Sequence, residues 1–223
     1  MQREYKTVLR QALGETEEKK SRFIASVKPI QDEDEAVAFI NQIKSKYWDA
    51  THNVYSYYIC GNNIIQRFSD DGEPSGTAGM PVLEVIKRMG VQDVVVVVTR
   101  YFGGTLLGAA GLIRAYSKCA SVGIENAVIV RRLLCTEVNI IVEYTLFGKL
   151  QSMFSASGYV VKDIVYGQDV EITLYIQSDE VEGFINTVVE ATNARAIMET
   201  GENIYITVDE KGKIIEKDEG RNA

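Results

Sequence analysis

The sequence has few of the residues that most often build metal, disulfide and imidazole sites. Among its 223 residues it has one histidine, His52, and three cysteines, Cys60, Cys119 and Cys135. Because the cysteines are odd in number and far apart, neither a disulfide framework nor a Cys-x-x-Cys zinc site is expected. Such cysteine usage is typical of a reducing compartment, and we expect a cytoplasmic protein.

Long apolar runs and a secretory signal are also missing. The longest aliphatic block, Val94–Val98, is far shorter than the roughly 20 residues that cross a bilayer. Residues 1–15 contain no apolar core of a signal peptide, so we expect no membrane partner. With 46% hydrophobic and 25% charged residues, the composition is that of an ordinary globular protein.

The net charge of −7 is distributed unevenly along the chain. Residues 1–134 contain 17 Lys and Arg against 15 Asp and Glu, a net charge of +2, whereas residues 135–223 contain 7 against 16, a net charge of −9. An acidic half repels phosphates, because affinity for nucleic acid comes largely from neutralising them. Any contact with nucleic acid is therefore expected in the first half, and its basic residues would have to cluster.

Periodicity predicts an α+β protein of two domains, 1–133 and 134–215, followed by a disordered tail over 216–223. In the first domain, strand and helix signals alternate, with a continuous apolar run over 93–102 that is typical of a strand buried on both faces. The expected elements are strands over 21–30, 54–60, 64–68 and 93–102, and helices over 32–48, 80–89 and 106–126.

The second domain is predicted to have the order βαββαβ, which is the ferredoxin-like pattern. Asp179 and Glu182 have the spacing of a capping box at the start of its second helix. The expected strands are 136–144, 159–166, 170–177 and 203–208, with helices over 145–157 and from 179 onward.

Two glycine-rich segments, 69–79 and 99–108, concentrate glycine, carboxylate, hydroxyl and arginine. Gly103, Gly104 and Thr105 follow a predicted strand and precede a predicted helix, a position that offers backbone N–H groups to an anion. Ala109 and Ala110 stand where a Walker A motif has Lys and Ser or Thr, so nucleotide hydrolysis of the usual kind is disfavoured. The structural alternative is that Gly108 and Gly111 allow the helix to pack tightly on the sheet and that Thr105 caps the helix.

Arg100 and Arg114 lie beside these segments and could bind an anion through charge-assisted hydrogen bonds, each contributing about 1.5–3 kcal/mol. After the cost of association, a lone phosphate would bind at about millimolar concentration, so such a site needs a polymer, a larger ligand or a protein partner. The alternative is that one or both arginines pair with nearby carboxylates.

Asp70, Asp71 and Glu73 suggest either a Mg²⁺ or acid–base site, or an acidic turn locked by Gly72 and Pro74. An EF-hand is excluded by the spacing, and the acidic turn is the favoured interpretation. His52 has polar and aromatic neighbours, and no nucleophile is evident beside it in the sequence. A hydrogen-bonded structural histidine is therefore favoured over a catalytic one.

Together these segments resemble the signature of the IMPACT/YigZ family. The resemblance rests on 20–24, on His52 with 55–57, on 69–79, on 99–108 and on 111–116, and it covers essentially the whole chain. It implies a first domain similar to the second domain of ribosomal small-subunit and ribonuclease PH-like proteins, with a left-handed βαβ crossover. It also implies a second domain similar to a ferredoxin-like domain of elongation factor G. Eukaryotic members regulate translation by competing for a ribosome-associated activator of an initiation-factor kinase, whereas this chain resembles the bacterial two-domain type.

We therefore predict a non-enzymatic, translation-associated regulator that binds RNA or a ribosome-associated protein through its first domain, with no cofactor, no metal and no catalytic residue. The alternatives are a Mg²⁺-dependent enzyme acting on phosphoesters or nucleotides, and a pure protein-interaction module. The predicted binding residues are His52, Asp70, Asp71, Glu73, Gly76, Thr77, Arg100, Gly103, Gly104, Thr105 and Arg114.

Overall fold

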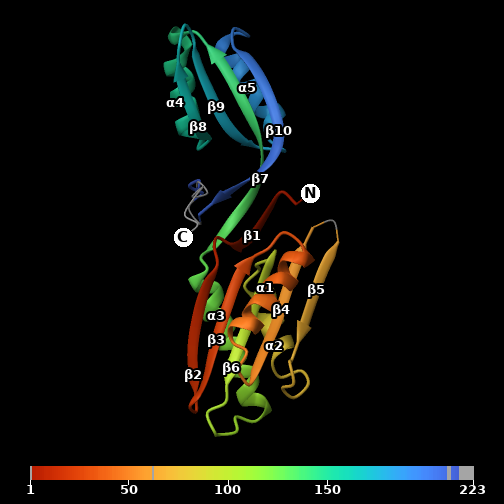
Figure 1. Ribbon diagram of the computed structural model, residues 1–223. Coiled ribbons are helices and arrows are strands. Elements are labelled where there is room, and N and C mark those ends of the chain that lie inside the picture. Colours follow the sequence, from red (N-terminus) through yellow and green to blue (C-terminus); the bar gives the residue numbers. More distant parts are fainter. Residues whose placement is uncertain (1, 62, 210–211, 216–223) are drawn as a thin grey trace. The chain divides into compact units, whose positions relative to one another are not determined.

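The computed structural model describes residues 2–61, 63–209 and 212–215, and these residues form a mixed α+β fold (Figure 1). The described chain divides into two compact units, a first unit of residues 5–130 and a second unit of residues 2–4, 131–209 and 212–215. None of the helices among the described residues is long and apolar enough to cross a membrane. The predicted tail over 216–223 lies outside the described residues.

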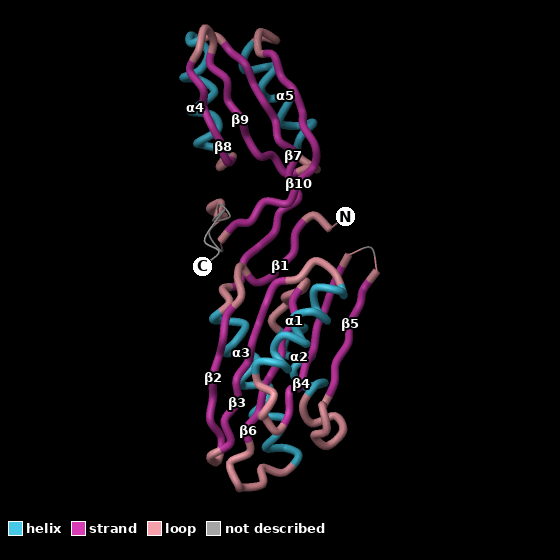
Figure 2. The backbone as a smooth tube through the Cα atoms, viewed as in Figure 1, coloured by secondary structure: helices cyan, strands magenta, loops and turns pink. Residues whose placement is uncertain are grey.

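The first unit is built on one antiparallel sheet with the strand order β2-β3-β6-β4-β5 (Figure 2). The strands of this sheet are β2 (Ala12–Glu18), β3 (Ser21–Pro29), β4 (His52–Cys60), β5 (Ile64–Ser69) and β6 (Val94–Tyr101). The strand β1 (Glu4–Val8) precedes them in the chain and is not part of this sheet. The helices of the first unit are α1 (Glu33–Lys46), α2 (Gly79–Arg88) and α3 (Ala109–Asn126).

Helices cover both faces of this sheet, and the central strand β6 is buried between them. Val94, Val96 and Val98 pack into a core with α2 and α3, whereas Val95 and Val97 pack into a separate core with α1. The apolar run therefore forms a strand buried on both faces, as predicted, although its neighbours are antiparallel. The sheet and the helices on its two faces form three layers. Within the sheet, the C-terminal end of β6 lies beside the start of β4, where His52 is opposite Arg100 in the register.

Several predicted boundaries of the first unit are wrong. The strands β1 and β2 were not predicted. For β2 the reason is that the turn from β2 to β3 has Lys19 and Lys20 at positive φ instead of the usual Asn-Gly. The helix α1 begins directly after its predicted cap, Asp32, whose side chain accepts a hydrogen bond from the Glu35 amide at 2.8 Å. The side chain of Val37 on this helix is 45% exposed. The helix α3 begins at Ala109 instead of residue 106.

The second unit has the predicted order βαββαβ and an antiparallel sheet in which β7 lies between β10 and β9, and β8 pairs with β9. Its elements are β7 (Ile129–Val142), α4 (Tyr144–Ser157), β8 (Val160–Tyr166), β9 (Val170–Gln177), α5 (Val181–Thr192) and β10 (Ile197–Val208). The side chains of Phe154 and Phe184 are buried between the sheet and the two helices.

One helix start in this unit differs from the prediction. The cap of α5 is Glu180, which makes no side-chain capping hydrogen bond, and Asp179 instead forms an ion pair with Arg3 at 2.6 Å. Asp179, which has the chemistry of a helix cap, therefore pairs with a cation that is far away in the sequence. The stop of α4 at Gly158, which has φ of +70°, is confirmed.

Candidate functional site

The two glycine-rich segments form neighbouring loops at one end of the first unit. One loop joins β5 to α2, and the other joins β6 to α3. The carboxylate of Asp70 organises the first of them by accepting hydrogen bonds from three backbone amides, those of Gly76 at 2.9 Å, Ala78 at 3.1 Å and Gly79 at 2.8 Å. Because α2 begins at Gly79, this carboxylate also satisfies donors at the helix start.

Asp71 connects the same loop to α1 and β4. Its carboxylate accepts from Lys44 Nζ at 2.8 Å and from the Asn53 backbone amide at 2.7 Å. Its carbonyl oxygen lies 2.7 Å from Nδ1 of His52. Since a carbonyl can only accept, Nδ1 carries the proton, and Nε2 faces Glu73 with 4.0 Å to Oε1. His52 is thus hydrogen-bonded through Nδ1, as expected from its polar neighbours.

Glu73 and Arg100 form a buried ion pair beneath the two loops. Glu73 is 8% exposed and Arg100 is 5% exposed, and Nη1 of Arg100 lies 2.5 Å from Oε1 of Glu73. The same oxygen accepts from the Tyr116 hydroxyl at 2.7 Å. Burial, with the hydrogen bond to Glu73, raises the pKa of Tyr116 far above its ordinary value. The guanidinium lies between the rings of Phe23 and Phe102, 5.5 Å from each centroid.

Close backbone packing holds the second loop against the turn between β2 and β3. The Gly103 amide donates to Ser21 Oγ at 3.1 Å, and Arg100 Nη2 lies 3.4 Å from the same hydroxyl. A Cβ at Gly103 would lie 2.0 Å from the carbonyl carbon of Lys20, so only glycine fits there. Close packing is therefore found at Gly103, whereas the tight packing predicted at Gly108 is wrong, because a Cβ at that glycine would meet nothing within 4 Å.

The structure brings most of the predicted site residues into this network, where they bond to one another and to the backbone. Glu73 and Arg100 are its buried part, and His52 and Asp71 are half-buried at its edge. Of the other predicted loop residues, Gly76 donates its backbone amide to Asp70, and Thr77 donates its side-chain hydroxyl to the Pro74 carbonyl at 2.6 Å.

Three predicted residues lie outside the network. Gly104 and Thr105 are exposed in the loop over 102–108, and Arg114 is exposed on α3 with no ion pair or hydrogen bond to any described residue. The expected helix cap at Thr105 is wrong, because Gly108, with φ of +71°, precedes the first residue of α3 and Thr105 lies in the loop. The amides of 103–105 therefore do not form the N-terminus of a helix.

The three acidic side chains bind different partners and do not converge on one point. Among residues 2–61, 63–209 and 212–215, no group of three or more His, Cys, Asp or Glu side chains is placed to hold a metal ion. The arrangement can therefore fix two loops firmly, and its buried carboxylates already have donors.

Sequence reasoning did not assign site roles to Ser21, Asn53 and Tyr116. Thr99 Oγ1 donates to Asn53 Oδ1 at 2.7 Å, and both residues are buried. The one available signal was polar residues at core-facing positions of apolar elements, such as Tyr116 in α3 and Thr99 in β6. That signal indicates a buried polar network without naming the partners.

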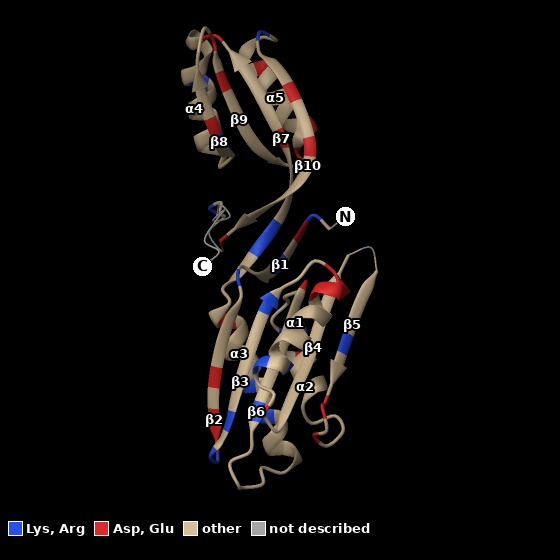
Figure 3. Cartoon of the chain, viewed as in Figure 1, with Lys and Arg blue, Asp and Glu red and all other residues tan. Residues whose placement is uncertain are grey.

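The outer surface of this end carries apolar and basic side chains. Phe102 is 46% exposed and Leu106 is 83% exposed in the loop over 102–108. Lys19 and Lys20 are exposed in the adjoining β2–β3 turn, which is blue in Figure 3. Neither lysine pairs with a described residue, whereas Arg22 forms a two-point ion pair with Glu15 at 2.7 and 2.9 Å.

The comparisons with known proteins cover both units. The Impact N-terminal domain model matches residues 19–124, and the model of a domain of unknown function, DUF1949, matches residues 140–195. The IMPACT family member YvyE of Bacillus subtilis is 43% identical over 187 residues, which is 84% of this chain and 86% of that protein.

More distant relatives match chiefly part of the chain. The IMPACT family member YigZ of Escherichia coli is 36% identical over 56% of this chain and 63% of that protein. Protein IMPACT of Xenopus laevis is 37% identical over 43% of this chain and 32% of that protein. A solved structure described as a hypothetical protein has a TM-score of 0.57 at 25% identity, covering 89% of this chain and 97% of that one.

Proposed function

This chain belongs to the IMPACT family, and we propose that it is a non-enzymatic, translation-associated regulator that binds RNA or a ribosomal component through its first unit. The residues of its signature divide into two groups. One group is buried and has an evident structural role, as in the pair formed by Glu73 and Arg100. The other group is exposed and is available for a partner.

The observation that carries the proposal is the exposed loop over 102–108. Leu106 is 83% exposed, so packing within the described structure does not account for this side chain. The loop lies against the turn that carries Lys19 and Lys20, and Arg114 follows it on α3. Loops held on a rigid scaffold are where binding residues concentrate, and unpaired cations around such a loop suit a phosphate backbone.

The proposal includes the finer fold assignments. We propose that the first unit is similar to the second domain of ribosomal-protein and ribonuclease PH-like folds. We propose that the second unit is ferredoxin-like and similar to a domain of elongation factor G. The antiparallel order β10-β7-β9-β8 supports the latter assignment. The handedness of the crossover from β3 through α1 to β4 stays a prediction.

The test measures binding to a labelled single-stranded RNA oligonucleotide and co-sedimentation with ribosomal subunits over a range of salt concentrations. With roughly three phosphates neutralised, the slope of log K against log salt is expected to be about −2. Changing Lys20→Ala or Arg114→Ala should reduce the slope by about 0.7 each. Arg67→Ala is the matched control, because β5 is the opposite edge strand from β2 and Arg67 is similarly exposed.

Binding that does not depend on salt concentration, or the absence of binding to both the RNA and the ribosomal subunits, would contradict the proposal. The enzymatic alternative is tested separately with a screen of phosphoester and nucleotide substrates. If a turnover is found and survives both Asp71→Asn and Arg100→Ala, it does not arise from this site.

A further inference from the structure

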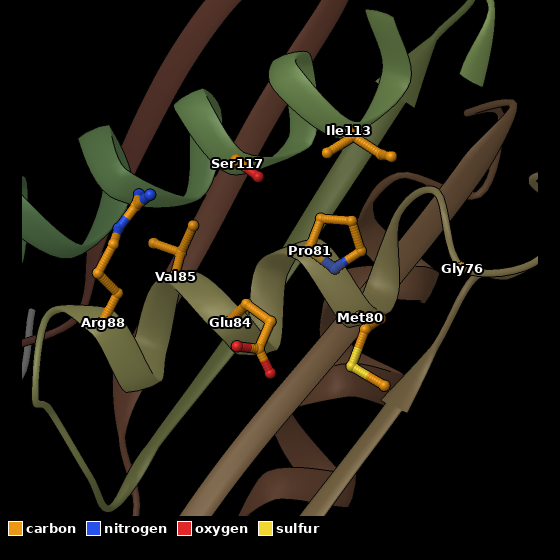
Figure 4. A pocket seen from close by; sticks show the side chains of 8 residues that line it. All are labelled: Gly76, Met80, Pro81, Glu84, Val85, Arg88, Ile113 and Ser117. Carbon is orange, nitrogen blue, oxygen red and sulfur yellow. The ribbon is translucent and has the colours of Figure 1, made fainter. Parts of the chain in front are cut away.

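A groove of about 380 Å³ runs between α2 and α3 on the outer face of the first unit (Figure 4). Its size lies in the lower part of the range for binding pockets, about 300–1,000 Å³. The residues that matter most in its lining are Met80, Pro81, Glu84, Val85, Arg88 and Ile113. Gly76 of the loop over 69–79 also lines the groove, whereas Asp70, Asp71 and Glu73 do not.

Apolar side chains from both helices remain partly exposed at the groove. Met80 on α2 is 38% exposed and Ile113 on α3 is 41% exposed, while Pro81 and Val85 between them are buried and form the floor. The two helices already pack against one another and the sheet through other residues, including Val82, Ile86 and Leu112 in the common core. Met80 and Ile113 therefore form an apolar strip that no other side chain of the first unit covers fully.

The charges around this strip are mainly basic. Arg88 lines the groove, and Arg114 and Lys118 lie on the outer face of α3. All three side chains are exposed, and none pairs with a residue in the described part of the chain. Glu84 is the acidic residue of the lining, and Lys87 lies 3.6 Å from it. A basic, partly apolar surface is notable in a chain whose net charge is −7.

We propose that the groove between α2 and α3 binds an acidic amphipathic segment of a partner protein, with an apolar side chain between Met80 and Ile113 and a carboxylate on Arg88. An amphipathic helix lying in a hydrophobic groove is a recurring mode of peptide recognition. The apolar floor and the apolar side chains of Met80 and Ile113 give a sugar–phosphate backbone nothing to contact. These features favour a protein segment over RNA at this surface, which is distinct from the loop over 102–108.

The experiment uses the full chain and a fluorescein-labelled helical peptide with leucines at i, i+3, i+4 and i+7 and glutamates between them. A matched peptide has lysines in place of the glutamates. Fluorescence polarisation should show that the glutamate peptide binds at least about tenfold more tightly than the lysine peptide. Ile113→Asp and Arg88→Glu should each weaken its binding by about tenfold or more, which is about 1.4 kcal/mol.

The controls are matched in exposure and charge on the opposite face of the sheet. Val37→Asp on α1 replaces an apolar residue that is 45% exposed, compared with 41% for Ile113. Lys46→Glu reverses an exposed cation on the same helix. Both variants should bind the peptide like the parent protein, and circular dichroism checks that all four variants fold.

The alternatives give different results and each overturns the proposal. No binding of the glutamate peptide, or binding that Ile113→Asp leaves unchanged, excludes this groove as the site. Competition by single-stranded RNA that Ile113→Asp abolishes assigns the groove to nucleic acid. Self-association that Ile113→Asp abolishes assigns it to a second copy of the chain. Arg114 lies near both surfaces, so the two proposals are separated by Lys20→Ala, which changes only the proposed RNA loop, and by Ile113→Asp, which changes only the groove.

Discussion

Replacing Glu73 with leucine should destabilise the first unit severely, because it leaves the Arg100 guanidinium buried without a counter-charge. Arg100 is 5% exposed, and removing one partner of a buried pair costs about 3–5 kcal/mol. The Tyr116 hydroxyl also loses its acceptor, which adds about 1–3 kcal/mol if no water replaces it. The total is a large fraction of a typical stability of about 5–15 kcal/mol.

The double variant Glu73→Leu with Arg100→Met tests whether the cost comes from the unpaired charge. Apolar replacement of a whole buried pair is often neutral, so the double variant should be more stable than Glu73→Leu alone. Methionine also keeps an apolar group between the rings of Phe23 and Phe102. Adding Tyr116→Phe removes the remaining unpaired hydroxyl and should recover a further part of the loss.

Hydrogen exchange measured by mass spectrometry suits this chain, because two units need not unfold together. Amides of β6 should exchange at least about 100-fold faster in Glu73→Leu, which corresponds to the lower bound of about 3 kcal/mol from the unpaired charge alone at 1.4 kcal/mol per tenfold. Amides of β9 in the second unit provide the internal reference. The reasoning is refuted if β6 keeps its protection in Glu73→Leu, or if the double variant is no more stable than the single one.

Further predictions concern the loops and the response to pH. Asp70→Ala should lower the stability of the first unit by about 2 kcal/mol, since three backbone donors lose their acceptor, and Asp70→Asn should cost less; thermal melts compare them. Gly103→Ala should loosen the loop over 102–108 and speed its proteolysis, because its Cβ would meet the Lys20 backbone. Gly104→Ala is the control: its Cβ has open space, so the stability of the first unit should fall by only about 1–2 kcal/mol for the positive φ. Burial raises the pKa of Cys119 from 9.0 to about 11, so its thiol ionises in the unfolded chain before it does in the folded one. The stability that the neutral thiol contributes is fully present below pH 9 and is lost as pH rises to 11, by up to about 3 kcal/mol. Urea titrations at several pH values should show the free energy of unfolding falling less steeply with pH in Cys119→Ala than in the parent protein. Equal slopes would contradict the assignment.

Local features of the sequence were enough to predict most elements. The run of five valines from Val94 indicated a strand buried on both faces, and Gly158 indicated the end of α4. Predictions failed where a distant partner decided the outcome. Asp179 has the chemistry of a cap but pairs with Arg3, and the turn at Lys19 and Lys20 has positive φ without the residues that usually signal it.

The candidate site illustrates the same division. The concentration of glycine, carboxylate and arginine marked the right loops, and the acidic turn was the favoured interpretation of Asp70 and Asp71. What the sequence could not say was which arginine would be buried. Arg100 pairs with Glu73 because antiparallel pairing places the end of β6 beside the start of β4, under the loop that carries Glu73. Arg114, a similar residue in a similar segment, remains exposed.

By itself, then, the sequence determined the order of elements in the second unit, the layered burial of β6 and the family signature, because these depend on periodicity, backbone chemistry and residue identity along the chain. Only the tertiary structure decided that the acidic side chains point inward to separate partners, and that the loop over 102–108 and the groove between α2 and α3 are the surfaces left over. The reason is that a charged side chain takes whichever partner the strand register and loop closure bring within hydrogen-bond distance, and that distance is not encoded in any local pattern.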